Sequence, residues 1–187
     1  MQIETLSNRN VKVEDYQSTF IVLNVDGELL RFDFKKKVEF RLNKGTVGKL
    51  KYFENHPLLI DYNENFVETF INSKPENSEK FTEEIKNAID EKTLGWRNWK
   101  DYVVDGSFFQ YENFVKNIND GNGRLLKAPY LITQSLIQVC EKHNVKIKSF
   151  GSELKTENYK LIIIENDFVI AKEFQINIKA ATNSRLA

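Results

Sequence analysis

Residues 18–34 read STFIVLNVDGELLRFDF, and this stretch decides the fold that we expect. Its first part, 18–25, is rich in β-branched and aromatic residues, which is typical of a strand. Asp26-Gly27 follows, and this pair favours a two-residue hairpin because both central positions of a type I′ turn need a positive φ. The returning segment alternates apolar and polar residues, with apolar side chains at Leu30, Phe32 and Phe34. The stretch therefore predicts an antiparallel hairpin with one buried face.

Further strands are expected on both sides of a helical middle. The alternation continues beyond the hairpin at Val38, Phe40 and Leu42, which we expect to face the core, and Asn43-Lys44-Gly45 is expected to turn the chain. Three C-terminal ranges have strand composition: 145–150, 159–165 and 168–178. Asn166-Asp167 is the hairpin turn expected between the last two.

The middle of the chain has the apolar spacing of helices. Helical spacing is found in five segments: 66–71, 81–89, 96–103, 114–118 and 132–143. Gly95 and Asn144 are placed to end two of these helices. Strands followed by helices and again by strands favour an α+β fold. We expect a mostly antiparallel sheet formed by the N-terminal and C-terminal strands, with the central helices packed on one face.

Length and composition predict one α+β domain that covers residues 1–187, with a frayed tail at 180–187. The chain has one cysteine, Cys140, so no internal disulfide and no oxidising compartment are expected. The N-terminal residues lack the basic start and apolar run of a signal peptide, and no apolar run is long enough to span a bilayer. We therefore expect a cytoplasmic protein, and the Lys-, Asn- and Glu-rich composition is of a bacterial type.

Opposite charges are separated along the chain although the net charge is zero. Residues 31–51 contain eight basic and two acidic side chains, whereas residues 61–91 contain nine acidic and three basic ones. Such blocks attract each other across a fold or form two polar recognition faces.

Catalytic and metal chemistry have little support in the residues. Cys140 and His143 are three apart on one expected helix face, but a zinc site needs further ligands and a reactive thiolate needs exposure. We interpret Cys140 as a buried structural residue and expect no catalytic residues, no metal and no cofactor. The loop at Gly121-Asn122-Gly123 precedes an expected helix and resembles a phosphate cradle only weakly, so an ordinary loop is the preferred interpretation.

Three functional hypotheses remain, and the first is a non-enzymatic protein-binding module of an inhibitory or toxin-neutralising type. An acidic face around 61–91 would steer a basic partner, and tryptophan with arginine is favoured at protein-binding hot spots. The candidate partner-binding residues are Glu83, Glu84, Trp96, Arg97 and Trp99.

The second hypothesis is an enzyme or a small-ligand binder with a pocket between the sheet and the helices. Its candidate ligand-binding residues are His56, Asp61 and Arg124.

The third hypothesis is weak nucleic-acid binding through the basic segment 31–51. Its candidate residues are Lys35, Lys36, Lys37 and Arg41. Phenylalanines alternate with these cations, so a strand would bury the rings on the opposite face. A base-stacking surface needs rings and cations on the same wet face, and this argument counts against the segment.

Overall fold

The computed structural model describes residues 3–104, 110–151 and 157–178. The tail expected at 180–187 lies outside the described residues. The chain forms two compact units: one comprises Met1–Leu59 with Asn158–Ala187, and the other is the insertion Ile60–Glu157. Two compact units can still unfold in one cooperative transition. The expectation of a single domain therefore stays a prediction.

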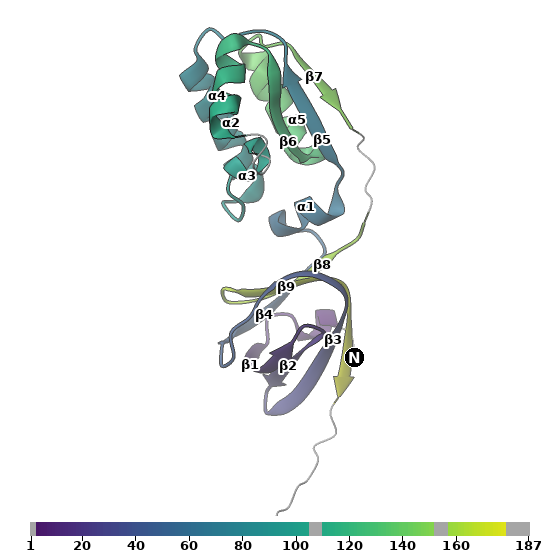
Figure 1. Ribbon diagram of the computed structural model, residues 1–187. Helices are drawn as coiled ribbons and strands as arrows, with labels where there is room; N and C mark the ends of the chain where they lie inside the picture. Colours follow the sequence, from purple (N-terminus) through teal and green to yellow (C-terminus); the bar gives the residue numbers. More distant parts are fainter. Residues whose placement is uncertain (1–2, 105–109, 152–156, 179–187) are drawn as a thin grey trace, which may run out of the picture. The chain divides into compact units, whose positions relative to one another are not determined.

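The first unit is a closed six-stranded barrel in which all neighbouring strands are antiparallel (Figure 1). Its strands are β1 (Asn10–Gln17), β2 (Phe20–Val25), β3 (Glu28–Arg41), β4 (Val47–Phe53), β8 (Lys160–Ile164) and β9 (Asp167–Ile178). Their order is β1-β2-β3-β9-β8-β4, and β4 pairs with β1 to close the ring. Closure pairs the two strands, β1 and β4, that would otherwise be the edges of the sheet.

The barrel interior is apolar and is filled from every strand. Its fully buried members include Val13, Ile21, Leu23, Leu30, Phe32, Leu50, Ile162, Ile164, Val169 and Ala171. A 3₁₀ helix, η1 (Ile3–Leu6), adds Ile3 and Leu6 to this cluster. The hairpin prediction at Asp26-Gly27 is confirmed, because Val25 pairs with Glu28 and the two turn residues have φ of 54° and 91°. The second turn is shifted by one residue from the prediction and consists of Glu165 and Asn166.

A bulge in β3 changes which residues face the core. Lys36 has a positive φ of 49°, and the register with β9 shifts between Lys37 and Glu39. The inward alternation therefore stops after Phe34, and Val38 and Phe40 are about 40% exposed. The expectation that Val38 and Phe40 face the core is wrong, whereas Leu42 is buried as expected.

A buried carboxylate fixes the turn that leads from β3 to β4. Asp167, at the start of β9, is 2% exposed. Its oxygens accept hydrogen bonds from Asn43 N at 2.7 Å, from Asn43 Nδ2 at 2.6 Å and from Thr46 Oγ1 at 2.6 Å. These bonds replace the water that a buried carboxylate loses.

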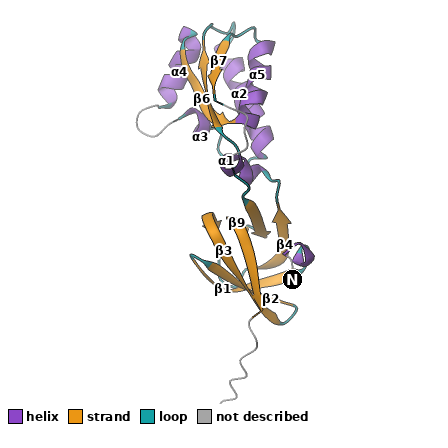
Figure 2. Ribbon diagram, turned by 90° about the vertical axis from the view of Figure 1, so that its right-hand side faces the viewer, coloured by secondary structure: helices purple, strands orange, loops and turns teal. Residues whose placement is uncertain are grey.

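The second unit is a three-stranded antiparallel sheet with helices. Its strands are β5 (Phe66–Ile71), β6 (Gly123–Pro129) and β7 (Ile147–Phe150), in the order β6-β5-β7. Its helices are α1 (Ile60–Asn63), α2 (Ser78–Thr93), α3 (Lys100–Val103), α4 (Tyr111–Asp120) and α5 (Tyr130–Lys142). One apolar cluster joins the inner sheet residues to α2, α3, α4 and α5, so these helices pack on the same face of the sheet (Figure 2). A short 3₁₀ helix, η2 (Pro57–Leu59), precedes this unit.

Helix ends follow ordinary capping chemistry. Asn77 Oδ1 accepts a hydrogen bond from Lys80 N at 2.9 Å at the start of α2, whose buried stripe contains Phe81, Ile85 and Ile89. Leu94 and Gly95 both have positive φ where this helix ends, and Asn144 has φ of 53° after α5. The predicted ends at Gly95 and Asn144 are confirmed.

The structure has both helices and strands, as an α+β class requires, and the N-terminal and C-terminal strands pair antiparallel, but they do not form the expected layer under the helices. The N-terminal and C-terminal strands close on themselves, and the central helices pack on a sheet of their own. Residues 66–71 were expected to be helical and form the central strand β5. Apolar side chains on both faces of a strand reproduce helical spacing, so periodicity alone misled this prediction.

Candidate functional site

The described helices of the second unit cover one face of its sheet. Along β5, Val67, Thr69 and Ile71 are buried towards the helices. The alternate residues Phe66, Glu68 and Phe70 must lie on the opposite face, because neighbouring strand residues point to opposite sides. This second face is the candidate site.

Strand pairing places residues of β6 and β7 beside those of β5. Glu68 pairs with Lys127 on one side and with Phe150 on the other, and Phe70 pairs with Arg124 and with Lys148. Paired residues of antiparallel strands share a face. We call this surface the outer face, and its members are Phe66, Glu68, Phe70, Arg124, Lys127, Lys148 and Phe150.

A bulge in β6 brings Arg124 to the outer face. The register shifts between Thr69, which pairs with Leu126, and Phe70, which pairs with Arg124. The extra residue is Leu125, and both Leu125 and Leu126 are fully buried in the helix-side core. With regular alternation through β6, Arg124 would lie on the same side as Leu126, towards that core. The bulge thus places Arg124 on the outer face, where its side chain is 15% exposed.

The phenylalanines of the outer face remain open to solvent. Phe150 is 52% exposed and Phe66 is 42% exposed, while Phe70 is partly buried. Phe70 and Phe150 meet edge to face, with ring centroids 5.8 Å apart and an interplanar angle of 82°. Apolar surface patches that are larger than single scattered side chains often mark a binding surface.

Three cations surround these rings, and one carboxylate lies among them. Lys148 Nζ is 4.9 Å from the Phe150 ring centroid. Glu68 Oε1 is 3.8 Å from both Arg124 Nη1 and Lys127 Nζ. Both ion pairs are long, and the Lys127 side chain is 47% exposed. The outer face therefore carries a net positive charge next to flat apolar rings.

The basic segment of the barrel places one exposed ring, Phe40, beside a cation. Lys35 Nζ pairs with Glu173 at 2.9 Å, Lys37 Nζ lies 3.6 Å from the Phe40 ring centroid, and Lys36 is exposed just before the β3 bulge. Arg41 donates two hydrogen bonds to the Asn166 carbonyl, at 3.1 and 2.7 Å. Lys35, Lys37 and Arg41 therefore each contact another group of the barrel.

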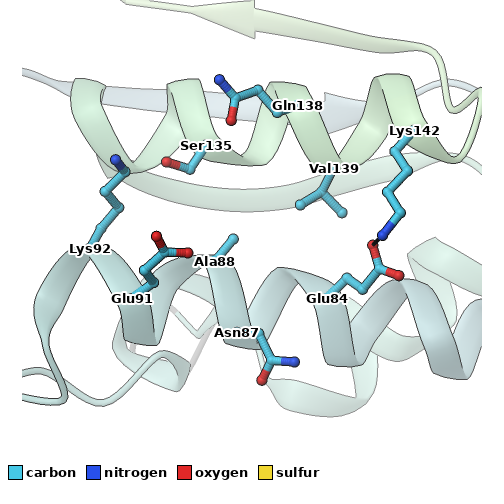
Figure 3. Close-up of a pocket in the computed structure, with 9 residues that line it drawn as sticks. All are labelled: Glu84, Asn87, Ala88, Glu91, Lys92, Ser135, Gln138, Val139 and Lys142. Carbon is cyan, nitrogen blue, oxygen red and sulfur yellow. Dashed lines mark ion pairs between the residues drawn. The ribbon is translucent and has the colours of Figure 1, made fainter.

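The candidate partner-binding residues divide among different environments. Glu84 ties α2 to α5, because its Oε2 is 2.8 Å from Lys142 Nζ and 3.2 Å from His143 Nε2. The hydrogen bond from Lys142 holds the pKa of Glu84 below its ordinary value. Figure 3 shows this ion pair at one end of a polar groove of about 420 Å³ between α2 and α5. Glu83 is exposed away from this tie.

Trp96, Arg97 and Trp99 are not one patch either. Trp96 is 36% exposed, whereas Trp99 is partly buried against Tyr111 and Phe114, with centroid distances of 5.8 and 6.0 Å. Arg97 Nε is 2.9 Å from Asp61 Oδ2, so it turns towards α1.

The ligand-pocket candidates belong to separate clusters. Asp61 Oδ1 accepts a hydrogen bond from the buried Tyr102 hydroxyl at 2.8 Å. Burial, with this carboxylate beside it, raises the pKa of Tyr102 well above its ordinary value. Arg124 instead pairs with Glu68 on the outer face. His56 belongs to the barrel unit, where its ring lies 4.9 Å from that of Phe53 and burial lowers its pKa.

The remaining sequence candidates have structural roles. Cys140 is 1% exposed, and burial raises the pKa of its thiol to about 12, which suppresses the thiolate. His143 ends α5. A strand, β6, follows the loop at 121–123, so the expected helix start that a phosphate cradle needs is not there.

Neither metal-ligand clusters, nor membrane-spanning helices, nor similar proteins indicate a function. Among the described residues, no three His, Cys, Asp or Glu side chains gather closely enough to hold a metal ion. Within the same residues, no helix has both the length and the apolar character to cross a membrane. No family model matches the chain, and comparison with curated proteins and with solved structures gives no match.

The sequence analysis did not identify the outer face. Phe66, Glu68 and Phe70 alternate with apolar residues, and this period of two was available in the sequence. The pairing of β5 with both β6 and β7 was not, because register between distant strands follows from tertiary packing.

Proposed function

We propose that the protein binds single-stranded nucleic acid on the outer face. The observation that carries this proposal is that exposed phenylalanines and cations share one face of an open sheet, namely Phe66, Phe150, Lys127 and Lys148. Bases stack on aromatic rings, and cations between the rings contact the phosphates. The segment 31–51 has a smaller version of this arrangement, in which Lys37 Nζ lies 3.6 Å from the centroid of the exposed Phe40 ring.

A single strand suits this face better than a duplex. Stacking requires unpaired bases, because the rings of a duplex are already stacked on each other. Reading a major groove requires an inserted helix or a two-stranded ribbon, and the outer face is the flat side of a sheet. Stacking also tolerates any base, so we expect little sequence preference.

The test is fluorescence anisotropy with a labelled single-stranded oligothymidine, titrated at several salt concentrations. Three cations contacting phosphates give a slope of log K against log salt of about −2. The double variant Phe66→Ala/Phe150→Ala should bind about tenfold or more weakly, because a stacked base contributes roughly 1–3 kcal/mol. Both side chains are exposed, so the variant should keep its circular dichroism spectrum.

The matched control is Phe40→Ala, which removes an exposed ring from the barrel. It should bind as the unaltered protein does. Equal loss in both variants would move the site to the barrel, and no binding at low salt would end the proposal. Preferential binding of a duplex would end the single-strand proposal as well.

A further inference from the structure

A second groove in the insertion joins aromatic and acidic side chains. It lies between α2 and α4 and has a volume of about 470 Å³. We call it the α2–α4 groove. Its apolar side is formed by Trp99, Tyr111, Val115 and Ile118, and the exposed carboxylates along it are Glu79 and Glu83. The groove shares no residue with the outer face.

We propose that the α2–α4 groove binds an arginine-bearing segment of a basic protein partner. The indole of Trp99 and the ring of Tyr111 offer surfaces on which a guanidinium stacks. Val115 and Ile118 suit the apolar stem of an arginine, and Glu79 and Glu83 attract its charged end. This inference is independent of nucleic-acid binding.

One cation of the chain itself lies against the ring of Tyr111 in this groove. Lys100 Nζ lies 4.9 Å from the Tyr111 ring centroid. The basic residue that lines the groove, Lys86, pairs with Asp90 at 3.9 Å one turn further along α2. The charge of the lining residues is therefore negative overall, with two carboxylates against one ammonium.

Two residues on one helix provide a matched comparison. Glu83 lines the α2–α4 groove, whereas Glu91 lines the groove on the other side of α2, against α5. Both are exposed glutamates on α2, so Glu83→Gln and Glu91→Gln change the net charge equally. A difference between them reports the position of the carboxylate.

The experiment uses tryptophan fluorescence of the full chain. The protein has two tryptophans, so Trp96→Phe leaves Trp99 as the reporter inside the groove. The probe is a short blocked peptide of alternating glycine and arginine, and its control contains citrulline, which keeps the arginine shape without the charge. We expect the arginine peptide to change Trp99 emission in a saturable, salt-dependent way.

Two variants then test whether the peptide binds in the α2–α4 groove. Glu83→Gln should weaken arginine-peptide binding up to about fivefold, the range of one exposed ion pair, and Glu91→Gln should leave it unchanged. Neither should alter oligothymidine binding. Equal affinity for the citrulline peptide, equal loss in both variants, or no change in Trp99 emission would overturn the proposal. Sedimentation of a dimer that Glu83→Gln dissociates would assign the groove to a second copy and overturn it too.

Discussion

Glu68 lies directly opposite Phe150 across the β5–β7 pair. The only carboxylate among the seven outer-face residues is therefore next to the most exposed ring of that face. Its Oε1 is also 3.8 Å from both Arg124 Nη1 and Lys127 Nζ, so it reduces the positive field where a phosphate would bind. A polyanion bound as we propose would have to compete with this carboxylate for the two cations.

Replacing Glu68 by glutamine should strengthen oligonucleotide binding. The substitution removes one negative charge while keeping the size of the side chain, so we expect affinity to rise about twofold to fivefold at low salt. The same titration of anisotropy against salt measures the effect. Glu112→Gln, on the exposed side of α4, gives the same change in net charge and should leave the affinity unchanged. Weaker binding by the Glu68 variant would mean that Glu68 contacts the ligand itself.

The barrel should depend strongly on the buried carboxylate of Asp167. Asp167→Asn presents an amide N–H₂ to a site that now accepts three hydrogen bonds, from Asn43 N, Asn43 Nδ2 and Thr46 Oγ1. We expect a loss of about 2–4 kcal/mol in the free energy of unfolding, because unpaired buried donors are costly. Urea unfolding followed by circular dichroism measures it.

The control for that substitution is Asp26→Asn. Asp26 is an exposed turn residue with φ of 54°, a conformation that asparagine tolerates, so its change should stay within about 0.5 kcal/mol. A similar small loss at Asp167 would show that water or another group satisfies the three donors.

Local sequence signals predicted hairpin turns and helix ends, but they did not predict how the strands assemble into sheets. Asp26-Gly27 acts through its own φ angles, and Asn144 and Gly95 end helices for the same local reason. Barrel closure instead requires β4 to meet both β1 and β8, and β8 lies more than a hundred residues further along the chain. No local pattern encodes that pairing, so the strands were expected to form an open sheet under the helices.

The outer face could not be predicted from the sequence for a related reason. The argument that a stacking surface needs rings and cations on one face counted against residues 31–51, but its premise is wrong for Phe40, which is 38% exposed with Lys37 Nζ 3.6 Å from its ring centroid. It could not point to Phe66, Lys127 and Phe150, which come from three strands whose register includes a bulge. Regular alternation in place of the bulge would turn Arg124 to the other face, so side-chain direction there depends on tertiary packing.

The thiol of Cys140 should be unreactive in the native protein. Burial raises its pKa from 9.0 to about 12, so the thiolate is scarce at pH 8 and the sulfur is inaccessible. A pKa raised by folding gives stability that is complete below about pH 9 and is lost as the pH rises towards 12. Labelling with a chromogenic disulfide at pH 8 should be slow when folded and fast in urea.

A thiol on the exposed side of the same helix is the matched control. Gln138→Cys in a Cys140→Ala background keeps one cysteine on α5 but places it at an exposed position. It should react at the rate of a free thiol. Rapid labelling of native Cys140 would instead reveal an opening of α5 from the core.

The insertion should fold and bind without the barrel. Its apolar cluster, from Ile71 to Val145 with Ile147 packed against it, lies entirely within 60–157, as do all seven outer-face residues. A fragment of residues 60–157 should therefore unfold cooperatively, give the circular dichroism of mixed helix and strand, and bind oligothymidine with unchanged affinity.

The reciprocal chain replaces 60–157 by a short glycine-serine linker, which is feasible because Phe53 of β4 pairs with Leu161 of β8. It should fold as a barrel and fail to bind. A fragment that is unfolded alone would make the two units one cooperative domain, and binding retained by the barrel chain would place the nucleic-acid site there.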